Sequence, residues 1–71
     1  MKRVDLLRMI SRAAMEAGLP WVLVREGGNH SIFTLRDIAV QIPRHRDIDG
    51  LTAKAIMKHL EGELGVKWWI R

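Results

Sequence analysis

The chain has 71 residues, of which 48% are hydrophobic and 28% are charged, a balance typical of one small globular domain rather than a disordered segment. It contains no cysteine, which excludes disulfide scaffolds and thiolate metal sites. Twelve Lys and Arg against eight Asp and Glu leave a formal net charge of +4, which favours anionic partners, with nucleic acid first among them. No apolar run approaches the ~20 residues of a membrane span, and no signal peptide is visible. We therefore expect a cytoplasmic protein with no membrane contact.

Residues 2–17 have the apolar spacing of an amphipathic helix, which we expect to end at Gly18. Three short segments rich in β-forming residues follow, at 21–25, 30–35 and 38–42. Helical spacing returns over 49–64, with Asp49 as the N-cap. This order predicts an α+β fold in which two helices cover one face of a three-stranded antiparallel sheet.

The expected turns fix which residues share a face of that sheet. A turn at Gly27-Gly28 pairs Arg25 with His30, and a turn at Arg36-Asp37 pairs Phe33 with Val40. Directly opposed residues lie on the same face. The face under the helices is then expected to hold Val22, Val24, Phe33, Leu35, Ile38, Val40 and Ile42. The open face is expected to hold Trp21, Leu23, Arg25, His30, Ile32, Thr34, Ala39 and Gln41.

His30 is the first candidate for chemistry, because it follows a glycine-rich turn, Gly27-Gly28-Asn29. Glycines allow a phosphate to approach the backbone closely, and an imidazole transfers protons near neutral pH. Arg25 across the hairpin could hold a phosphate as a planar two-pronged donor. The plainer interpretation, an ordinary hairpin with a solvated histidine at its base, fits the same spacing.

Two further groups of basic residues are candidates for phosphate binding: the loop Arg44-His45-Arg46 and the helical pair Lys54 and Lys58. For both groups a merely solvated surface is the alternative. The three histidines are scattered without paired carboxylates, so we expect no metal site, and no motif for a small-molecule cofactor is visible. The aromatic pair Trp68-Trp69 more often completes a core or meets a partner than stacks on bases.

Several segments in this order resemble the HicA family of small bacterial toxins. They are Lys2 to Leu7, Val22 to Phe33 with Gly-Gly-Asn-His at its centre, Ile42 to Ile48, and Leu51 to Ile56. The resemblance covers most of residues 1–65 and leaves 66–71 as an apolar tail. It implies a fold like the double-stranded-RNA-binding domain, α-β-β-β-α, and a ribosome-independent endoribonuclease that cleaves mRNA and is silenced by a HicB-type antitoxin.

The resemblance also implies roles for individual residues. The family's essential histidine usually follows Gly-Ser, and here His30 follows Gly28-Asn29, so the serine is replaced. Lys54 and Lys58 fall where such folds place helix-borne lysines on phosphates. We therefore expect a metal-independent RNA endonuclease in which His30 is the general base and Arg25 or the loop 44–46 stabilises the developing charge. A non-catalytic RNA-binding module and a protein-interaction subunit are the alternatives.

Overall fold

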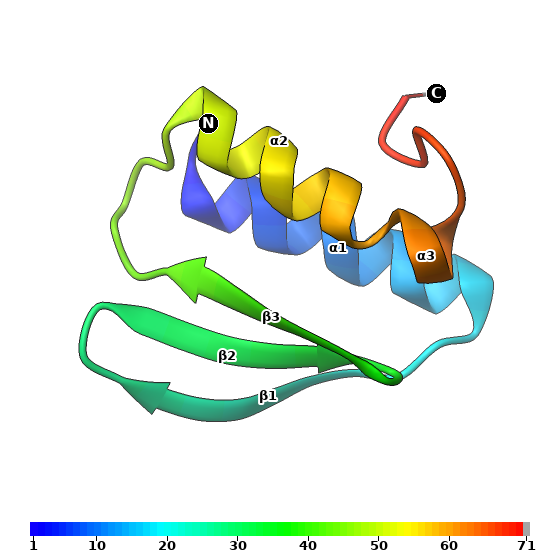
Figure 1. Ribbon diagram of the computed structural model, residues 1–71, viewed down its shortest axis with the longest axis horizontal. Helices are drawn as coiled ribbons and strands as arrows, with labels where there is room; N and C mark the ends of the chain where they lie inside the picture. The colour runs from blue at the N-terminus through cyan, green and yellow to red at the C-terminus, as the bar shows by residue number, and fades with distance from the viewer. Residues whose placement is uncertain (71) are drawn as a thin grey trace.

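The computed structural model describes residues 1–70. Its three strands form one antiparallel sheet in the order β1-β2-β3, and the helices lie together on one side of it (Figure 1). The elements are α1 (Arg3–Ala17), β1 (Trp21–Gly27), β2 (His30–Leu35), β3 (Ile38–Pro43), α2 (Gly50–His59) and α3 (Glu61–Leu64). This confirms the expected α+β order, except that the second helix divides at Leu60 into α2 and the short α3.

The local signals at the helix ends act as the sequence predicts. Gly18 adopts a left-handed conformation with φ 70° and returns its N–H to the carbonyls of Ala14 and Met15, which ends α1. The Asp49 carboxylate accepts hydrogen bonds from the N–H groups of Leu51 and Thr52, at 3.1 and 3.3 Å, and so caps α2.

The core lies between the helices and one face of the sheet, and every element except β1 and α3 contributes a buried apolar residue to it. Its fully or nearly fully buried members are Leu6, Ile10, Ala14, Leu35, Val40, Ile42, Ile48, Ala53, Ile56, Met57 and Leu60. His59 adds a polar tie between the layers, since its Nε2 lies 3.0 Å from the carbonyl oxygen of Ala39. Burial of this apolar surface is the main force that holds the helices to the sheet.

The expected turn of the first hairpin is displaced by one residue, which shifts the pairing of the two strands by two residues. The turn is formed by Gly28 and Asn29, so His30 opposes Gly27 and not Arg25. Gly28 has φ 56°, a left-handed conformation that glycine adopts without steric cost, and this favours its place inside the turn. A bulge between Leu23 and Arg25 then shifts the pairing a second time.

This register changes which residues of β1 face the helices. Val22 and Val24, expected in the core, are 49% and 58% exposed. Trp21, expected on the open face, is half-buried against the core and stacks on Phe33 with 4.5 Å between the ring centroids. Leu23, also expected on the open face, now pairs with Phe33 on the helix side and remains 48% exposed. The expected face of β1 is therefore reversed before the bulge.

The second hairpin has the expected register. Leu35 pairs with Ile38, Phe33 with Val40 and Ser31 with Ile42, around a turn at residues 36 and 37. Beyond the bulge, Arg25 pairs with Ile32, two residues from His30 on the same strand. The turn is displaced by one residue, which moves each pairing by two residues and leaves the faces unchanged, so Arg25 shares the open face with His30 as expected. The bulge reverses only the part of β1 that precedes it.

A hydrogen-bond network joins α1 to the hairpin on the helix side of the sheet. Arg3 donates from Nη2 to the Ser31 hydroxyl at 2.8 Å and from Nε to the Pro43 carbonyl at 2.8 Å. The Ser31 hydroxyl, which is fully buried, donates in turn to Glu26 Oε1 at 2.7 Å. Ser31 is the one buried polar residue among residues 1–70, and the network satisfies its hydroxyl, as burial requires.

The chain end after α3 folds back over the helices. The Trp68 indole donates a hydrogen bond to the Met57 carbonyl at 2.8 Å, and Trp68 and Trp69 both pack against the core in an edge-to-face pair. The backbone N–H of Lys67 donates to Glu61 Oε2 at 2.8 Å. Within residues 66–70 the aromatic pair therefore extends the core. Across residues 1–70 no helix combines the length and apolarity needed to span a membrane.

We predict that Trp68→Phe, which removes the indole donor and keeps an aromatic ring, lowers the free energy of unfolding by about 1 kcal/mol, the usual net value of one hydrogen bond. Urea denaturation followed by circular dichroism measures the change. Trp69→Phe is the matched control, since no hydrogen bond from the Trp69 indole is found among residues 1–70. Equal losses in the two variants would show that only ring volume matters.

Glu26 makes the stability of the fold depend on pH. The hydrogen bond from Ser31 lowers the pKa of the Glu26 carboxyl, and the positive charges of Arg44 and Arg3 lower it further, against a smaller opposing effect of desolvation. A folded-state pKa below the unfolded value stabilises the fold at pH values above the ordinary pKa of a carboxyl group, and this contribution disappears as the pH falls through the folded-state pKa.

We predict that Glu26→Gln reduces the loss of unfolding free energy at acid pH. Unfolding free energy measured against pH for both proteins tests this. Parallel curves for the two proteins would contradict it.

Candidate catalytic site and nucleic-acid interface

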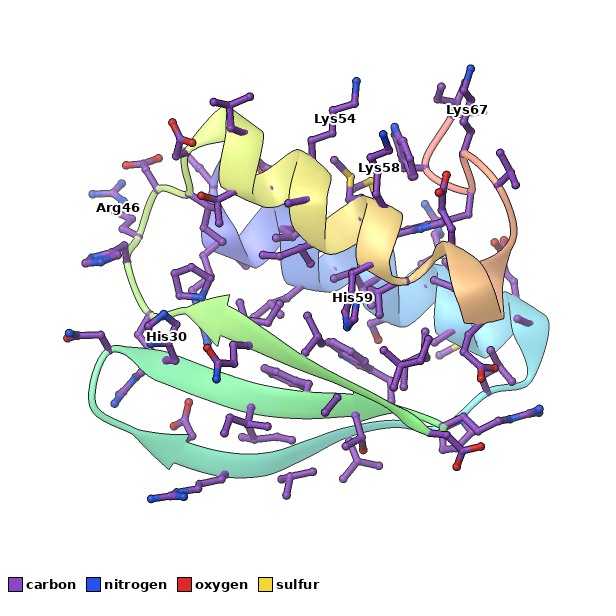
Figure 2. The ribbon with its side chains drawn as sticks, in the orientation of Figure 1. His30, Arg46, Lys54, Lys58, His59 and Lys67 are labelled. Carbon is purple, nitrogen blue, oxygen red and sulfur yellow. The ribbon has the colours of Figure 1, made fainter. Side chains whose placement is uncertain are left out.

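His30 is exposed and begins β2, at the end of the sheet where the first hairpin turns. Its face of the sheet is the open one, which no helix covers, because its neighbour Ser31 points into the core and successive residues of a strand alternate. Figure 2 places His30 at the same end of the molecule as Arg46 of the loop that follows β3. The imidazole is thus exposed to solvent on a residue whose backbone pairs with both neighbouring strands.

A shallow pocket of about 160 Å³ surrounds the imidazole; we call it the hairpin pocket. It is lined by Arg25, Gly27, Gly28, His30 and Ile32. A Cβ built on either glycine would meet no atom within 4 Å, so this wall is open backbone. The structure therefore brings together three residues singled out from the sequence, namely an acid–base group, a guanidinium and a glycine through which a ligand can approach the main chain.

The loop after β3 packs directly on the hairpin turn. The backbone N–H of Arg44 donates to the Asn29 carbonyl at 2.9 Å, and its Nη1 lies 3.4 Å from the Gly28 carbonyl oxygen. These contacts hold a second guanidinium beside the hairpin pocket. Asn29 is the second residue of the turn, and its backbone carbonyl accepts the hydrogen bond from Arg44.

A larger pocket of about 460 Å³ adjoins this loop on the side of α1; we call it the α1 pocket. It is lined by Lys2, Arg3, Val4, Leu7, Arg44 and Arg46. The pocket exists because the chain start pairs with the loop in a short antiparallel bridge: the Arg3 N–H donates to the Arg46 carbonyl at 2.9 Å and the Ile48 N–H to the Met1 carbonyl at 2.7 Å. The sequence predicts Lys2 and Arg3 as the beginning of a helix and as part of a segment that resembles the HicA family, with no role in a pocket. Nothing in helical periodicity signals a pairing with a loop more than 40 residues away.

The remaining basic candidates lie elsewhere. His45 is exposed in the loop and lines neither pocket. Lys54 and Lys58 are exposed on α2, and Figure 2 shows them projecting from the side of the helix turned away from the sheet. The structure therefore does not gather the helical lysines around His30. It places them beyond the loop 44–46, on another side of the molecule.

The side chains of the hairpin pocket suit proton transfer at a phosphate. A neutral imidazole accepts a proton and a guanidinium neutralises charge on phosphate oxygens, and both are within one exposed pocket. Among residues 1–70 no three or more His, Asp or Glu side chains are grouped in a way that could hold a metal ion. The side chains that line the hairpin pocket offer acid–base chemistry.

Comparison of the chain with protein-family models, with curated proteins and with solved structures gave no match.

Proposed function

We propose that this chain is an RNA endonuclease of the HicA toxin type, with a fold of the double-stranded-RNA-binding class, in which His30 is the catalytic base. The observation that carries the proposal is the exposed imidazole of His30 in one pocket with the guanidinium of Arg25. The order of the elements and the net charge of +4 are compatible with it. The substrate in this proposal is messenger RNA.

The proposed reaction uses the ribose as an internal nucleophile. Neutral His30 accepts the proton of a 2′-hydroxyl, and the freed oxygen attacks the adjacent phosphorus. The bond from phosphorus to the 5′-oxygen breaks, that oxygen takes up a proton, and a 2′,3′-cyclic phosphate remains on the upstream fragment. Every step is a proton transfer or a displacement at phosphorus, so no oxidant, reductant or cofactor enters the balance.

Arg25 and Arg44 supply the positive charge that this reaction requires. Charge builds up on the phosphate oxygens as the 2′-oxygen attacks, and donors fixed beforehand at that position stabilise it most. Arg25 lines the hairpin pocket, and Arg44 is held at its edge by the backbone bond to Asn29. The open backbone of Gly27 and Gly28 allows the phosphate to lie close to both.

We predict that His30→Ala lowers the rate of RNA cleavage about 10²–10⁴-fold, the usual contribution of a positioned general base. The assay is gel analysis of a labelled RNA in the presence of EDTA, with a DNA strand of the same sequence as a second substrate. Wild-type protein should cleave the RNA and leave the DNA intact, because DNA lacks the 2′-hydroxyl. His59→Ala is the control, since it removes an imidazole that lies on α2, outside the hairpin pocket, and is hydrogen-bonded to the Ala39 carbonyl.

The same assay separates the nuclease from a non-catalytic RNA-binding module. A binding module retains salt-dependent RNA binding and cleaves nothing, with or without His30. Undiminished cleavage by the His30→Ala protein would overturn the role of the imidazole. Loss of wild-type cleavage on addition of EDTA would overturn the metal-independent reaction.

We further propose a HicB-type antitoxin as the protein partner. A partner that silences the reaction must cover His30 and the guanidinium groups around it, and an acidic surface complements them. We predict that the protein encoded by the neighbouring reading frame, when expressed together with this chain, elutes with it and suppresses RNA cleavage. The complex should weaken as salt is raised. Separate elution with full cleavage activity would contradict this partnership.

A further inference from the structure

We propose that the α1 pocket binds one nucleotide of the RNA strand next to the nucleotides that are cleaved, with its phosphate on the basic side chains and its sugar or base against Val4 and Leu7. The proposal rests on the proposed function for the identity of the strand. It adds a second binding site, apart from His30, built on residues at the start of the chain that sequence analysis did not assign to RNA.

The charge of the pocket favours a phosphate. Four of its six lining residues are basic and none is acidic, and a concave surface with charge of one sign concentrates the potential inside it. Glu26 is coupled to the charges of Arg3 and Arg44, and Asp47 opposes Lys2 in the backbone bridge. Two carboxylates against four basic residues leave the pocket with an excess of positive charge. The volume of about 460 Å³ lies within the range of about 300–1,000 Å³ that is usual for small-molecule sites.

The basic side chains divide into a fixed pair and a free pair. Arg3 is held by its bonds to Ser31 and Pro43, and Arg44 by its contact with Gly28. Among residues 1–70, no side-chain hydrogen bond or ion pair involves Lys2 or Arg46. The fixed pair gives the pocket its shape before a ligand arrives, and the free pair can close on a phosphate without breaking an internal contact.

The other wall of the pocket suits a sugar or a base. Val4 is 55% exposed although it is apolar, and Leu7 is half-buried beside it on the same helix. Contact with a ribose or a base would remove this apolar surface from water.

Arg44 connects this pocket to the catalytic one. Its side chain lines the α1 pocket, while its Nη1 lies 3.4 Å from the carbonyl oxygen of Gly28, which lines the hairpin pocket. A strand cleaved beside His30 can therefore continue over Arg44 into the α1 pocket without leaving basic surface. The geometry points to a binding path that begins at the open face of the sheet and ends at the start of α1.

The test compares two double variants that each remove two positive charges. Lys2→Gln/Arg46→Gln removes the free pair of the pocket. Arg8→Gln/Arg12→Gln is the matched control, because these arginines lie along α1 beside Asp5, outside both proposed sites. Both are made in a His30→Ala background, so that binding is measured without cleavage. The probe is a fluorescent single-stranded RNA of about 8 nucleotides, within the site sizes of small single-strand binders.

We predict that the Lys2→Gln/Arg46→Gln protein binds this RNA several-fold more weakly than the control protein. The slope of log affinity against log salt should be smaller by about 1.4, since each phosphate contact on a single strand contributes about 0.7. Equal weakening in the two double variants would mean that only overall charge matters and would overturn the pocket. Unchanged binding in the Lys2→Gln/Arg46→Gln protein would overturn it as well.

An NMR titration identifies the form in which the nucleotide arrives. Backbone amide shifts of Val4 and Leu7 should move with the RNA at concentrations where a free nucleoside monophosphate moves neither. Equal shifts with the mononucleotide would overturn the role of the strand and identify a free nucleotide as the ligand.

The binding test of the pocket is independent of catalysis. If wild-type protein cleaves no RNA but the Lys2→Gln/Arg46→Gln exchange still weakens binding, the nuclease proposal fails and the pocket stands. If cleavage depends on His30 and the Lys2→Gln/Arg46→Gln exchange leaves RNA binding unchanged, the nuclease proposal stands and the pocket proposal fails.

Discussion

The side chain of Arg3 holds together the three parts of the chain that make up the candidate site. It donates to the Ser31 hydroxyl and the Pro43 carbonyl, and its backbone N–H pairs with the Arg46 carbonyl. Ser31 follows His30 on β2 and Pro43 opposes His30 on β3. The backbone that carries the imidazole is therefore fixed from the helix side, while the imidazole itself faces the other way. Without this arginine, the side-chain hydrogen bonds that tie α1 to β2 and to the end of β3 would be lost.

The one-sided core explains why the site lies on the sheet and not between the layers. The apolar residues of α1 and α2 are sufficient to cover one face of three strands, and the other face remains without a helix. β1 is then an edge strand with exposed Val22 and Val24, a combination that invites pairing with another chain. The bulge beside Arg25 interrupts the regular edge at this point. Arg25 lies on the hairpin side of this bulge, where it pairs with Ile32 and shares the open face with His30.

The fold was largely predictable from the sequence because its signals are local. The glycine that ends α1, the Asp49 cap and the turn at residues 36 and 37 each act within a few residues, and all three are found where expected. The first hairpin has two adjacent glycines, and either register satisfies the turn chemistry, so the sequence pattern did not decide between them. The predicted grouping of Arg25 with His30 is correct because displacing the turn by one residue keeps both on the same face, and because the bulge lies beyond Arg25. The α1 pocket depends on a long-range backbone pairing and had no local signal.

The distribution of basic residues decides how an RNA strand could lie on this protein. Lys54 and Lys58 are on the side of α2 turned away from the sheet, whereas His30 is on the open face, so one short contact cannot include both groups. The loop 44–46 lies between them and contributes guanidinium groups that reach the hairpin turn on one side and α1 on the other. A bound strand that touches all the basic groups must therefore pass around the end of the molecule where this loop lies. A strand confined to the open face would use only Arg25, Arg44 and the imidazole, and the affinity would then depend little on the helical lysines. A strand that passes around the loop reaches the α1 pocket, whereas a strand confined to the open face does not.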